Sequence, residues 1–393
     1  MARETERFNR ALQKFLDDNP DIDFDKAKDE FIELYNSGEY KLDDDFTKAD
    51  DLYLEALKLE DTKLVMDALK KALNICPKHY EAKGELIILE SKSEDEKIMR
   101  LKSLLNEIKK DLEENGEIDF NDFERTLWLN IDVRPYLRNM FKLMMVYFNN
   151  LRYDEANVLG KELLRLDPEN HQNQTIFYLI SLLGLEKYEE ALNDSNEFFK
   201  LDKQAKYLFI SFLAALFKKD IEEAKKYIAD VVKYNGSYLC IILGIARLSN
   251  EDYSHIFDLN YVEEDSFEDA ARNIFCISRL IDNHISLIEE FIDNEGAYLI
   301  KLIDPDKKGM ELLFVLEAKR EATLKEIMQA ISQLKKQVDF AGLKDLSEAD
   351  IRKELIKLKN LIYLQYYDSK FVMTFLGYSV LEFFVGDGND DNN

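Results

Sequence analysis

The chain of 393 residues contains only 13 Gly and 5 Pro, so it has few of the residues that punctuate β-rich and loop-rich folds. With 46% hydrophobic residues it can bury a substantial core, which excludes wholesale disorder. The net charge of −26 excludes nucleic acid and anionic membrane as partners over most of the surface. The composition therefore predicts a folded protein made mostly of long helices joined by tight turns.

The charge is unevenly distributed along the chain. Residues 307–386 contain 13 Lys or Arg and 11 Asp or Glu, whereas residues 1–306 carry nearly all of the acidic excess. This contrast predicts a separate C-terminal unit, and it restricts any nucleic-acid binding to residues 305–386. The segment 387–393 contains three Asp and no basic residue, and we expect it to be a disordered acidic tail.

The N-terminal segment is predicted to form two helices between residues 5 and 36, because Asn19-Pro20 interrupts an otherwise helical pattern. Farther along, residues 94–114 have the apolar spacing of an amphipathic helix. We interpret residues 1–46 as capping helices with a polar outer face, of the kind that closes a repeat array.

Three segments in the middle of the chain share a turn followed by a helix start, with Ala at the same place in each. These alanines, Ala156, Ala191 and Ala224, are 35 and 33 residues apart and so bracket a period of 34 residues. A small residue is needed there because the two antiparallel helices of a hairpin cross most closely at that point. The pattern predicts repeated helix pairs.

This pattern resembles the tetratricopeptide repeat (TPR) family. The matching positions are Met140, Leu143, Met144, Tyr147, Ala156, Gly160, Leu163 and Pro168 within 137–170, and Leu52, Tyr53, Ala56, Leu69, Ala72 and Pro77 within 46–79. Arg134-Pro135-Tyr136 before the central repeat is also similar to uncharacterised bacterial TPR proteins. The resemblance implies an all-α, TPR-like antiparallel helix-hairpin solenoid over residues 47–304, clearest in 137–235.

The resemblance also implies a concave groove lined by the first helix of each pair. The residues at the groove positions are Arg138, Phe141, Met145, Phe148, Asn173, Ile176, Ile180, Lys206, Phe209 and Leu213. Most are large and apolar, which leaves two alternatives. The groove binds an amphipathic helix or an extended segment of a protein partner, or it is filled by the chain's own helices, at 94–112 or after 237, which would avoid an exposed apolar stripe.

A different pattern begins at Pro305. Three short helical patterns are followed by two β-rich stretches, 362–366 and 370–375, with a turn at 367–369. This order resembles the winged helix-turn-helix family, in which the third helix usually reads DNA and the hairpin is the wing. The link at 332–346 is longer than in that family, and Ser347 is the predicted N-cap of the third helix.

Basic residues on the third helix and the wing are the candidate nucleic-acid contacts implied by this resemblance: Arg352, Lys353, Lys357, Lys359 and Lys370. The unit is nearly neutral and the rest of the chain is acidic, which favours the alternative that this winged-helix-like domain docks a protein. Formation of a homodimer is a further alternative.

No catalytic signature is found: the sequence lacks Gly-x-Gly-x-x-Gly, a phosphate loop, Gly-x-Ser-x-Gly and His-Glu-x-x-His. The four histidines, His79, His171, His255 and His284, are isolated and lack the spacing of a metal pair. Asp21-x-Asp23-x-Asp25 has Lys26 where a calcium loop requires Gly, so we interpret it as a helix cap. We expect no catalytic residue, no metal site and no cofactor.

The three cysteines are far apart and are expected to be reduced core residues, and no stretch approaches the roughly 18 apolar residues of a membrane span. With no signal peptide recognised, the expected location is cytoplasmic. We therefore expect a non-enzymatic interaction scaffold that binds a protein or peptide on its repeat surface. The alternative is a transcription regulator with acidic sensor repeats and a DNA-binding winged helix.

Overall fold

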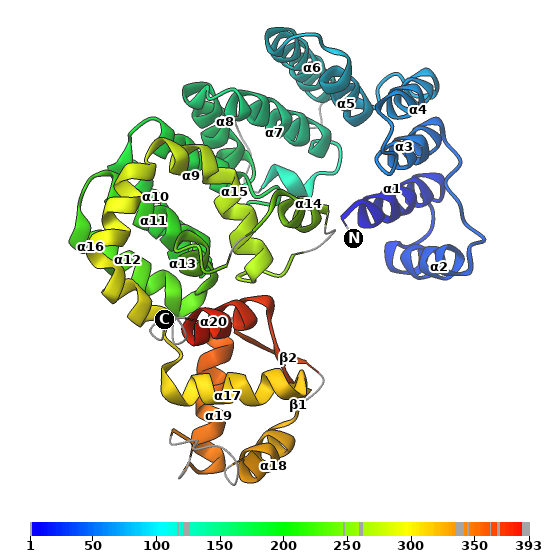
Figure 1. Cartoon of the computed structure of the whole chain (residues 1–393). Helices are drawn as coiled ribbons and strands as arrows, with labels where there is room; N and C mark the ends of the chain where they lie inside the picture. Colours follow the sequence, from blue (N-terminus) through cyan, green and yellow to red (C-terminus); the bar gives the residue numbers. More distant parts are fainter. Residues whose placement is uncertain are drawn as a thin grey trace. The chain divides into compact units, whose positions relative to one another are not determined.

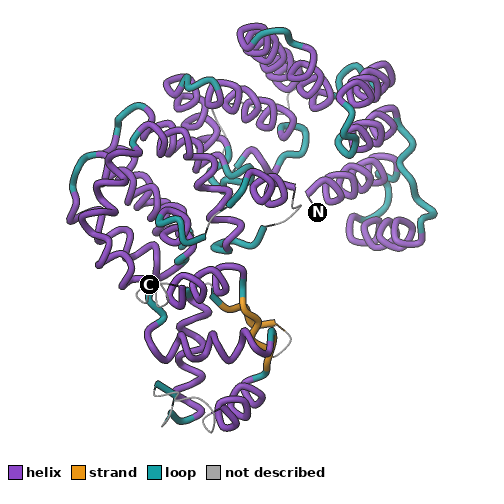
Figure 2. Tube along the Cα trace, viewed as in Figure 1, coloured by secondary structure: helices purple, strands orange, loops and turns teal. Residues whose placement is uncertain are grey.

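The structure is a computed structural model, and it describes residues 2–115, 118, 120, 126–246, 248–258, 262–334, 342–343, 346–361, 363–367 and 370–386. Within these residues the chain is mostly helical, with a single small sheet, which confirms the all-α expectation at this level (Figures 1 and 2). The predicted acidic tail 387–393 and the turn residues 368–369 lie outside the described residues. The chain divides into two compact units, Met1–Tyr178 and Leu179–Asn393.

Consecutive helices of the first unit pack on one another as pairs. They are α1 (Ala2–Asp18) with α2 (Phe24–Ser37), α3 (Asp45–Ala56) with α4 (Thr62–Ile75), α5 (Tyr80–Glu90) with α6 (Glu94–Glu114), and α7 (Arg134–Asn149) with α8 (Tyr153–Leu166). A short 3-10 helix, Leu127–Leu129, precedes α7. Figure 1 shows the pairs following one another in chain order.

Polar caps determine where several of these helices begin. The side chain of Asp23 accepts a hydrogen bond from the backbone N–H of Asp25 at 3.1 Å, and that of Asp44 accepts one from Thr47 at 2.7 Å. Such caps satisfy backbone donors that have no partner inside the helix. The interpretation of the Asp21-x-Asp23-x-Asp25 run as a helix cap is confirmed.

The small residues of the repeat pattern lie where helices approach each other. Ala56 and Ala72 are fully buried in the core between α3 and α4, and Ala156 is fully buried on α8. The approach of α5 to α7 is closer still, since a Cβ added at Gly84 would lie 1.8 Å from the side-chain oxygen of Asn139. These positions accept only small side chains because any larger one would force the helices apart.

Helix α6 includes residues 94–112, which the sequence offered as one of the segments that could fill the repeat groove. Its apolar stripe, Ile98, Leu101, Leu104, Leu105, Ile108 and Leu112, is buried. The helix packs against α5 and α7 within the first unit, as the second member of a pair. Of the two candidate fillers from the sequence, 94–112 is therefore wrong.

The second unit continues with helices around a central one. After α9 (Gln174–Gly184), which crosses the division between the units, come α10 (Tyr188–Leu201), α11 (Ala205–Phe217), α12 (Ile221–Tyr234), α13 (Ser237–Ile242), α14 (Asn250–Asp258), α15 (Phe267–Asn283) and α16 (Ile285–Ile303). All 13 residues of α11 are buried, and it contacts α10, α12 and α16. A helix that is apolar on all sides is stable only when it is covered on all sides.

The segment 267–293 forms parts of two helices, α15 and α16. It breaks at His284, whose ring stacks on Phe217 with 3.9 Å between ring centroids. The sequence contains neither Gly nor Pro at this point, so no local signal marks the break.

The C-terminal elements combine helices with a three-stranded antiparallel sheet. They are α17 (Asp306–Lys319), β1 (Glu321–Ala322), α18 (Leu324–Leu334), α19 (Glu348–Asn360), β2 (Leu364–Tyr367), β3 (Lys370–Met373) and α20 (Phe375–Gly386). The strand order is β1-β3-β2, with Glu321 opposite Val372, and Figure 2 shows the three strands together. The hairpin was expected from the sequence and β1 was not. Ser347 forms a capping box with Asp350 at the start of α19, as predicted.

These C-terminal elements are joined to the preceding helices by buried contacts. Tyr363 is fully buried, and its hydroxyl donates a hydrogen bond to the backbone carbonyl of Ile303 at 2.6 Å. The same hydroxyl is hydrogen-bonded to Cys240 on α13, and burial raises the pKa of that thiol to about 12. The change of pattern at Pro305 thus marks a change of secondary structure, while the compact unit extends from Leu179.

Candidate functional site

The groove positions on α11 lie inside the core of the second unit. Phe209 and Leu213 are fully buried, and the ring of Phe209 lies 4.6 Å from that of Tyr238 on α13. On the next turn Phe212 packs against Phe291 of α16. The chain's own helices after residue 237 therefore cover α11, as in the self-filled alternative, and these side chains are not exposed to a partner.

Lys206, another predicted groove residue, belongs to a buried charged cluster. Burial lowers the pKa of Lys206, and the carboxylates of Asp269 and Asp265 oppose that shift. Asp265 accepts a hydrogen bond from the backbone N–H of Ala205 at 2.8 Å, and burial raises its pKa to about 6. The cluster ties the segment before α15 to the first turn of α11, which is a structural role.

The remaining groove positions are divided between core and surface. Phe141 and Met145 are half-buried and Phe148 is buried, and both phenylalanines contact the ring of Phe177 edge-on. Ile176 and Ile180 are buried on α9, whereas Asn173 is exposed just before that helix. The predicted residues therefore do not form one continuous exposed surface.

Arg138 takes part in an internal ion-pair network of the first unit. Its guanidinium donates to Glu6 at 2.5 Å and to Glu81 at 2.6 Å, and Glu6 also pairs with Arg134 at 2.8 Å. Both arginines lie over the ring of Trp128, 5.2 to 5.3 Å from its centroid. Burial alone would lower the pKa of Arg138, but the two carboxylates raise it, so the side chain stays charged and paired.

The structure forms a binding-site candidate elsewhere in the first unit. Three hollows, of about 360, 200 and 570 Å³, are each lined by both Arg10 and Phe46. We call them together the Arg10 groove. The other lining residues used below are Arg7, Leu12, Leu16, Phe24, Tyr35, Tyr40, Lys41, Leu42, His79, Asp50, Asp51, Leu129 and Asp132.

Side chains from α1, from α3 and from the N-cap of α5 form a stack beside the hollows. The guanidinium of Arg10 lies 4.1 Å from the ring centroid of Phe46, and Phe46 stacks on His79 at 5.0 Å. Nδ1 of His79 accepts a hydrogen bond from the backbone N–H of Ala82, so the ring proton lies on Nε2, which donates to Asp50 at 3.3 Å. Both ring nitrogens are thus occupied, and His79 has a structural role.

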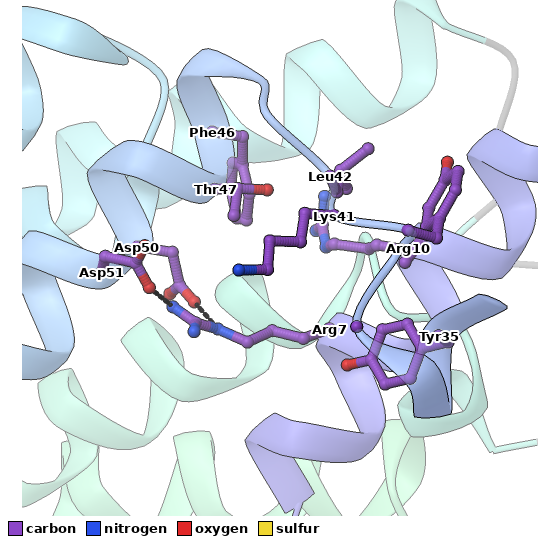
Figure 3. Close-up of a pocket in the computed structure, with 12 residues that line it drawn as sticks. Arg7, Arg10, Tyr35, Lys41, Leu42, Phe46, Thr47, Asp50 and Asp51 are labelled. Atoms are coloured by element: carbon purple, nitrogen blue, oxygen red, sulfur yellow. Dashed lines mark hydrogen bonds and ion pairs between the residues drawn. The ribbon is translucent and has the colours of Figure 1, made fainter.

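Asp50 links this stack to the wall formed by α1. Burial raises the pKa of the Asp50 carboxyl, but the hydrogen bonds from His79 and Arg7 outweigh it, so the net shift is downward. Arg7 donates to Asp50 at 2.7 Å and to Asp51 at 2.6 Å, as the dashed lines in Figure 3 mark. The charge of Arg7 is therefore more than offset by two carboxylates within the wall.

Lys41 reaches the 360 Å³ hollow from the connection between α2 and α3. Gly38 ends α2 with a φ of +76°, a conformation that costs glycine little. The N–H of Tyr40 then donates to the carbonyl of Leu34, and its ring packs on Phe15. This turn directs the exposed Lys41 side chain into the hollow, where Figure 3 shows its amine extending toward Arg7.

The 570 Å³ hollow is lined by two cations, Arg10 and Lys14, and three carboxylates, Asp17, Asp44 and Asp132, so it does not attract an anion. Its apolar lining includes Leu12, Leu16 and Leu42, and it is bordered by Phe24 and Leu129, which remain 59% and 57% exposed. Isolated exposed apolar residues are common on protein surfaces, but here two of them border the same hollow. This part of the Arg10 groove therefore suits an apolar side chain.

Sequence reasoning missed this site because its residues come from segments far apart in the chain. One signal was available: Arg7, Arg10 and Lys14 have spacings of 3 and 4, which places three cations on one face of the first helix in a strongly acidic chain. The other lining residues follow no pattern in the sequence.

The five candidate nucleic-acid contacts differ in their surroundings. Arg352, Lys353 and Lys359 are exposed on α19, and none of them forms an ion pair with a residue that the structure describes. Lys357 pairs with Asp306 at 2.7 Å, and Lys370 pairs with Glu321 at 2.5 Å.

Over the described ranges, no helix has the length and apolar character that crossing a bilayer requires, and no His, Cys, Asp or Glu cluster is suited to a metal ion. No protein-family model matches the chain, and a search of curated proteins finds no match to it.

Proposed function

We propose that this protein is a non-enzymatic adaptor whose first unit binds a short segment of a partner protein in the Arg10 groove. The observation that carries the proposal is the pair of hollows, about 360 and 570 Å³, which share Arg10 and Phe46 in their linings. Binding sites are typically concave, mostly apolar and provided with a few well-placed polar groups, with volumes of about 300 to 1,000 Å³. The two hollows have this character.

The helix pairs support a TPR-like solenoid as the scaffold. Their fully buried alanines, including Ala156, Ala191 and Ala224, recur near the period of the family, and helical repeat proteins commonly bind peptides on such surfaces. The proposed site is at the N-terminal helices because the inner-face positions on α11 are covered by α13 and α16.

Selection of displayed dodecamer peptides on the full chain tests this proposal. We expect the selected peptides to bind Arg10→Glu and Leu129→Asp variants at least about tenfold more weakly, a loss of about 1.4 kcal/mol. Lys71→Glu and Leu64→Asp are matched controls, since they make the same charge reversal and the same Leu-to-Asp change at exposed positions of α4 outside the groove. Equal binding by all four variants would refute the proposal.

Nucleic-acid binding by the C-terminal elements is a second candidate function. Three helices with a β1-β3-β2 sheet support the winged-helix resemblance, and the exposed cations on α19 favour contact with phosphates. The alternative of a transcription regulator rests on this observation.

For this candidate, we expect the Arg352→Ala/Lys353→Ala double variant to weaken binding of a random-sequence duplex at low salt. It should also reduce the slope of log K against log salt by about 2, because two phosphate contacts are lost. Lys301→Ala on α16 is the control. A full-length chain that binds no duplex at low salt, in a titration followed by fluorescence anisotropy, would eliminate this function.

A further inference from the structure

We infer that the Arg10 groove recognises an acidic residue, Asp or Glu, next to a large apolar residue in its partner; this inference rests on the proposed function. The lining of the 360 Å³ hollow has one excess positive charge and that of the 570 Å³ hollow has one excess negative charge, so a ligand carboxylate is favoured only in the first. The carboxylate would enter the hollow that Lys41 reaches, and the apolar side chain would enter the hollow bordered by Phe24 and Leu129.

The charges around the 360 Å³ hollow favour an anion. Three cations, Arg7, Arg10 and Lys41, and two carboxylates, Asp50 and Asp51, line it. Lys41 forms no ion pair with any described residue. In a chain with a net charge of −26, this lining therefore carries one excess positive charge. A ligand carboxylate near Lys41 would be attracted by it, and the apolar walls would strengthen that attraction relative to water.

Arg10 provides a second donor within the same hollow. Its partner is Asp132, at 3.1 Å, and the side chain of Asp132 is 54% exposed. Exposed ion pairs of this kind contribute about 0 to 1 kcal/mol, so a ligand carboxylate can share or replace that partner at little cost. Figure 3 shows Arg10 and Lys41 both reaching into the hollow.

The same balance of charge favours a carboxylate over a phosphate. Lys41 is the one lining cation in this hollow that lacks a described partner, since Arg7 and Arg10 already have carboxylates beside them. A singly charged carboxylate balances that single charge. A phosphate carries a charge of roughly −1.5 to −2 near neutral pH, and its excess would face Asp50 and Asp51.

The 570 Å³ hollow would bind the large apolar residue of the recognised segment. Leu12, Leu16 and Leu42 line it, and a Leu- or Phe-sized side chain buried there would be stabilised by about 1.5 to 3 kcal/mol. The Arg10–Phe46 stack lines both hollows, so the acidic and the apolar residue of the ligand lie close together in its sequence.

The test uses the displayed dodecamers and the full chain. We expect the selected peptides to be enriched in Asp or Glu within about three residues of a large apolar residue. In the tightest peptide, changing the acid to its amide should weaken binding to the wild-type chain at least about fivefold. In the Lys41→Met variant, the same change should weaken binding less than about twofold. Lys41 lies on an exposed connection, so this variant should fold normally, as judged by circular dichroism.

The outcomes separate this inference from the proposed function. If binding of the selected peptides depends on Arg10 and Leu129 but the peptides show no acidic enrichment, the inference fails and the proposed function stands. The same holds if changing the acid to its amide weakens binding equally in the wild-type chain and in Lys41→Met. If no selected peptide depends on Arg10 or Leu129, both fail. Binding that is more than tenfold tighter when the acid is replaced by phosphoserine would overturn the carboxylate assignment.

Discussion

Replacing Arg138 with Met is expected to lower the free energy of unfolding by about 3 to 5 kcal/mol, because it removes the ion pairs that Arg138 forms with the buried carboxylate of Glu81 and with Glu6. The Glu81 side chain is only 5% exposed and bonds Arg138 at 2.6 Å. Glu6 would keep its bond to Arg134. Urea unfolding followed by the fluorescence of Trp128, the single tryptophan, reports this region directly because its ring lies beside Arg138.

An exposed arginine on α8 provides the matched control. Arg165 pairs with Glu162 one turn away, and both side chains are well exposed, so Arg165→Met should cost less than about 1 kcal/mol. Adding Glu81→Gln to the Arg138→Met variant should recover part of the loss, since it removes a buried charge that has lost its ion pair with Arg138. A decrease of less than about 1 kcal/mol in the free energy of unfolding of Arg138→Met would contradict the structural role of Arg138. Its side chain would then again be a candidate partner contact.

The second large effect is expected at Phe209. Truncation to Ala should cost about 3 to 5 kcal/mol, because the side chain is fully buried against Tyr238 and Phe212, and its loss leaves a cavity at the centre of the second unit. Thermal and urea unfolding followed by far-UV circular dichroism measure this loss, and a comparison with Trp128 fluorescence shows which unit is affected.

Leu201→Ala is the control for this substitution. Leu201 ends α10 and is 85% exposed, so its truncation should change stability by no more than about 0.5 kcal/mol. Were Phe209→Ala equally mild, the inner face of the repeats would be open rather than filled by α13 and α16. A charged residue at Phe209 cannot test partner binding, because it would unfold the core that surrounds it.

Local signals explain the parts of the fold that were correctly predicted. The break at Asn19-Pro20, the caps at Asp23 and Ser347, and the buried stripe of 94–114 all depend on residues within a few positions of one another. Helix periodicity and capping are local properties, so the sequence suffices to predict them.

The errors occurred where stability comes from distant contacts. Strand β1 has two residues and exists only through pairing with β3, about 50 positions later in the chain. The break at His284 has no punctuating residue, and the ring instead stacks on Phe217. Apolar groove positions and apolar core positions have the same composition, so only packing distinguishes Phe209 as part of the core.

The sequence by itself determined that the chain is helical, where several helices begin, and which small residues allow them to pair. It also established the contrast between residues 1–306, which are strongly acidic, and residues 307–386, which are nearly neutral. The tertiary structure decided that α13 and α16 cover α11, and that Arg10, Lys41, Phe46 and Leu129 line neighbouring hollows. The physical reason is that a helix depends on contacts within one turn, whereas a groove depends on which faces of distant helices are left uncovered.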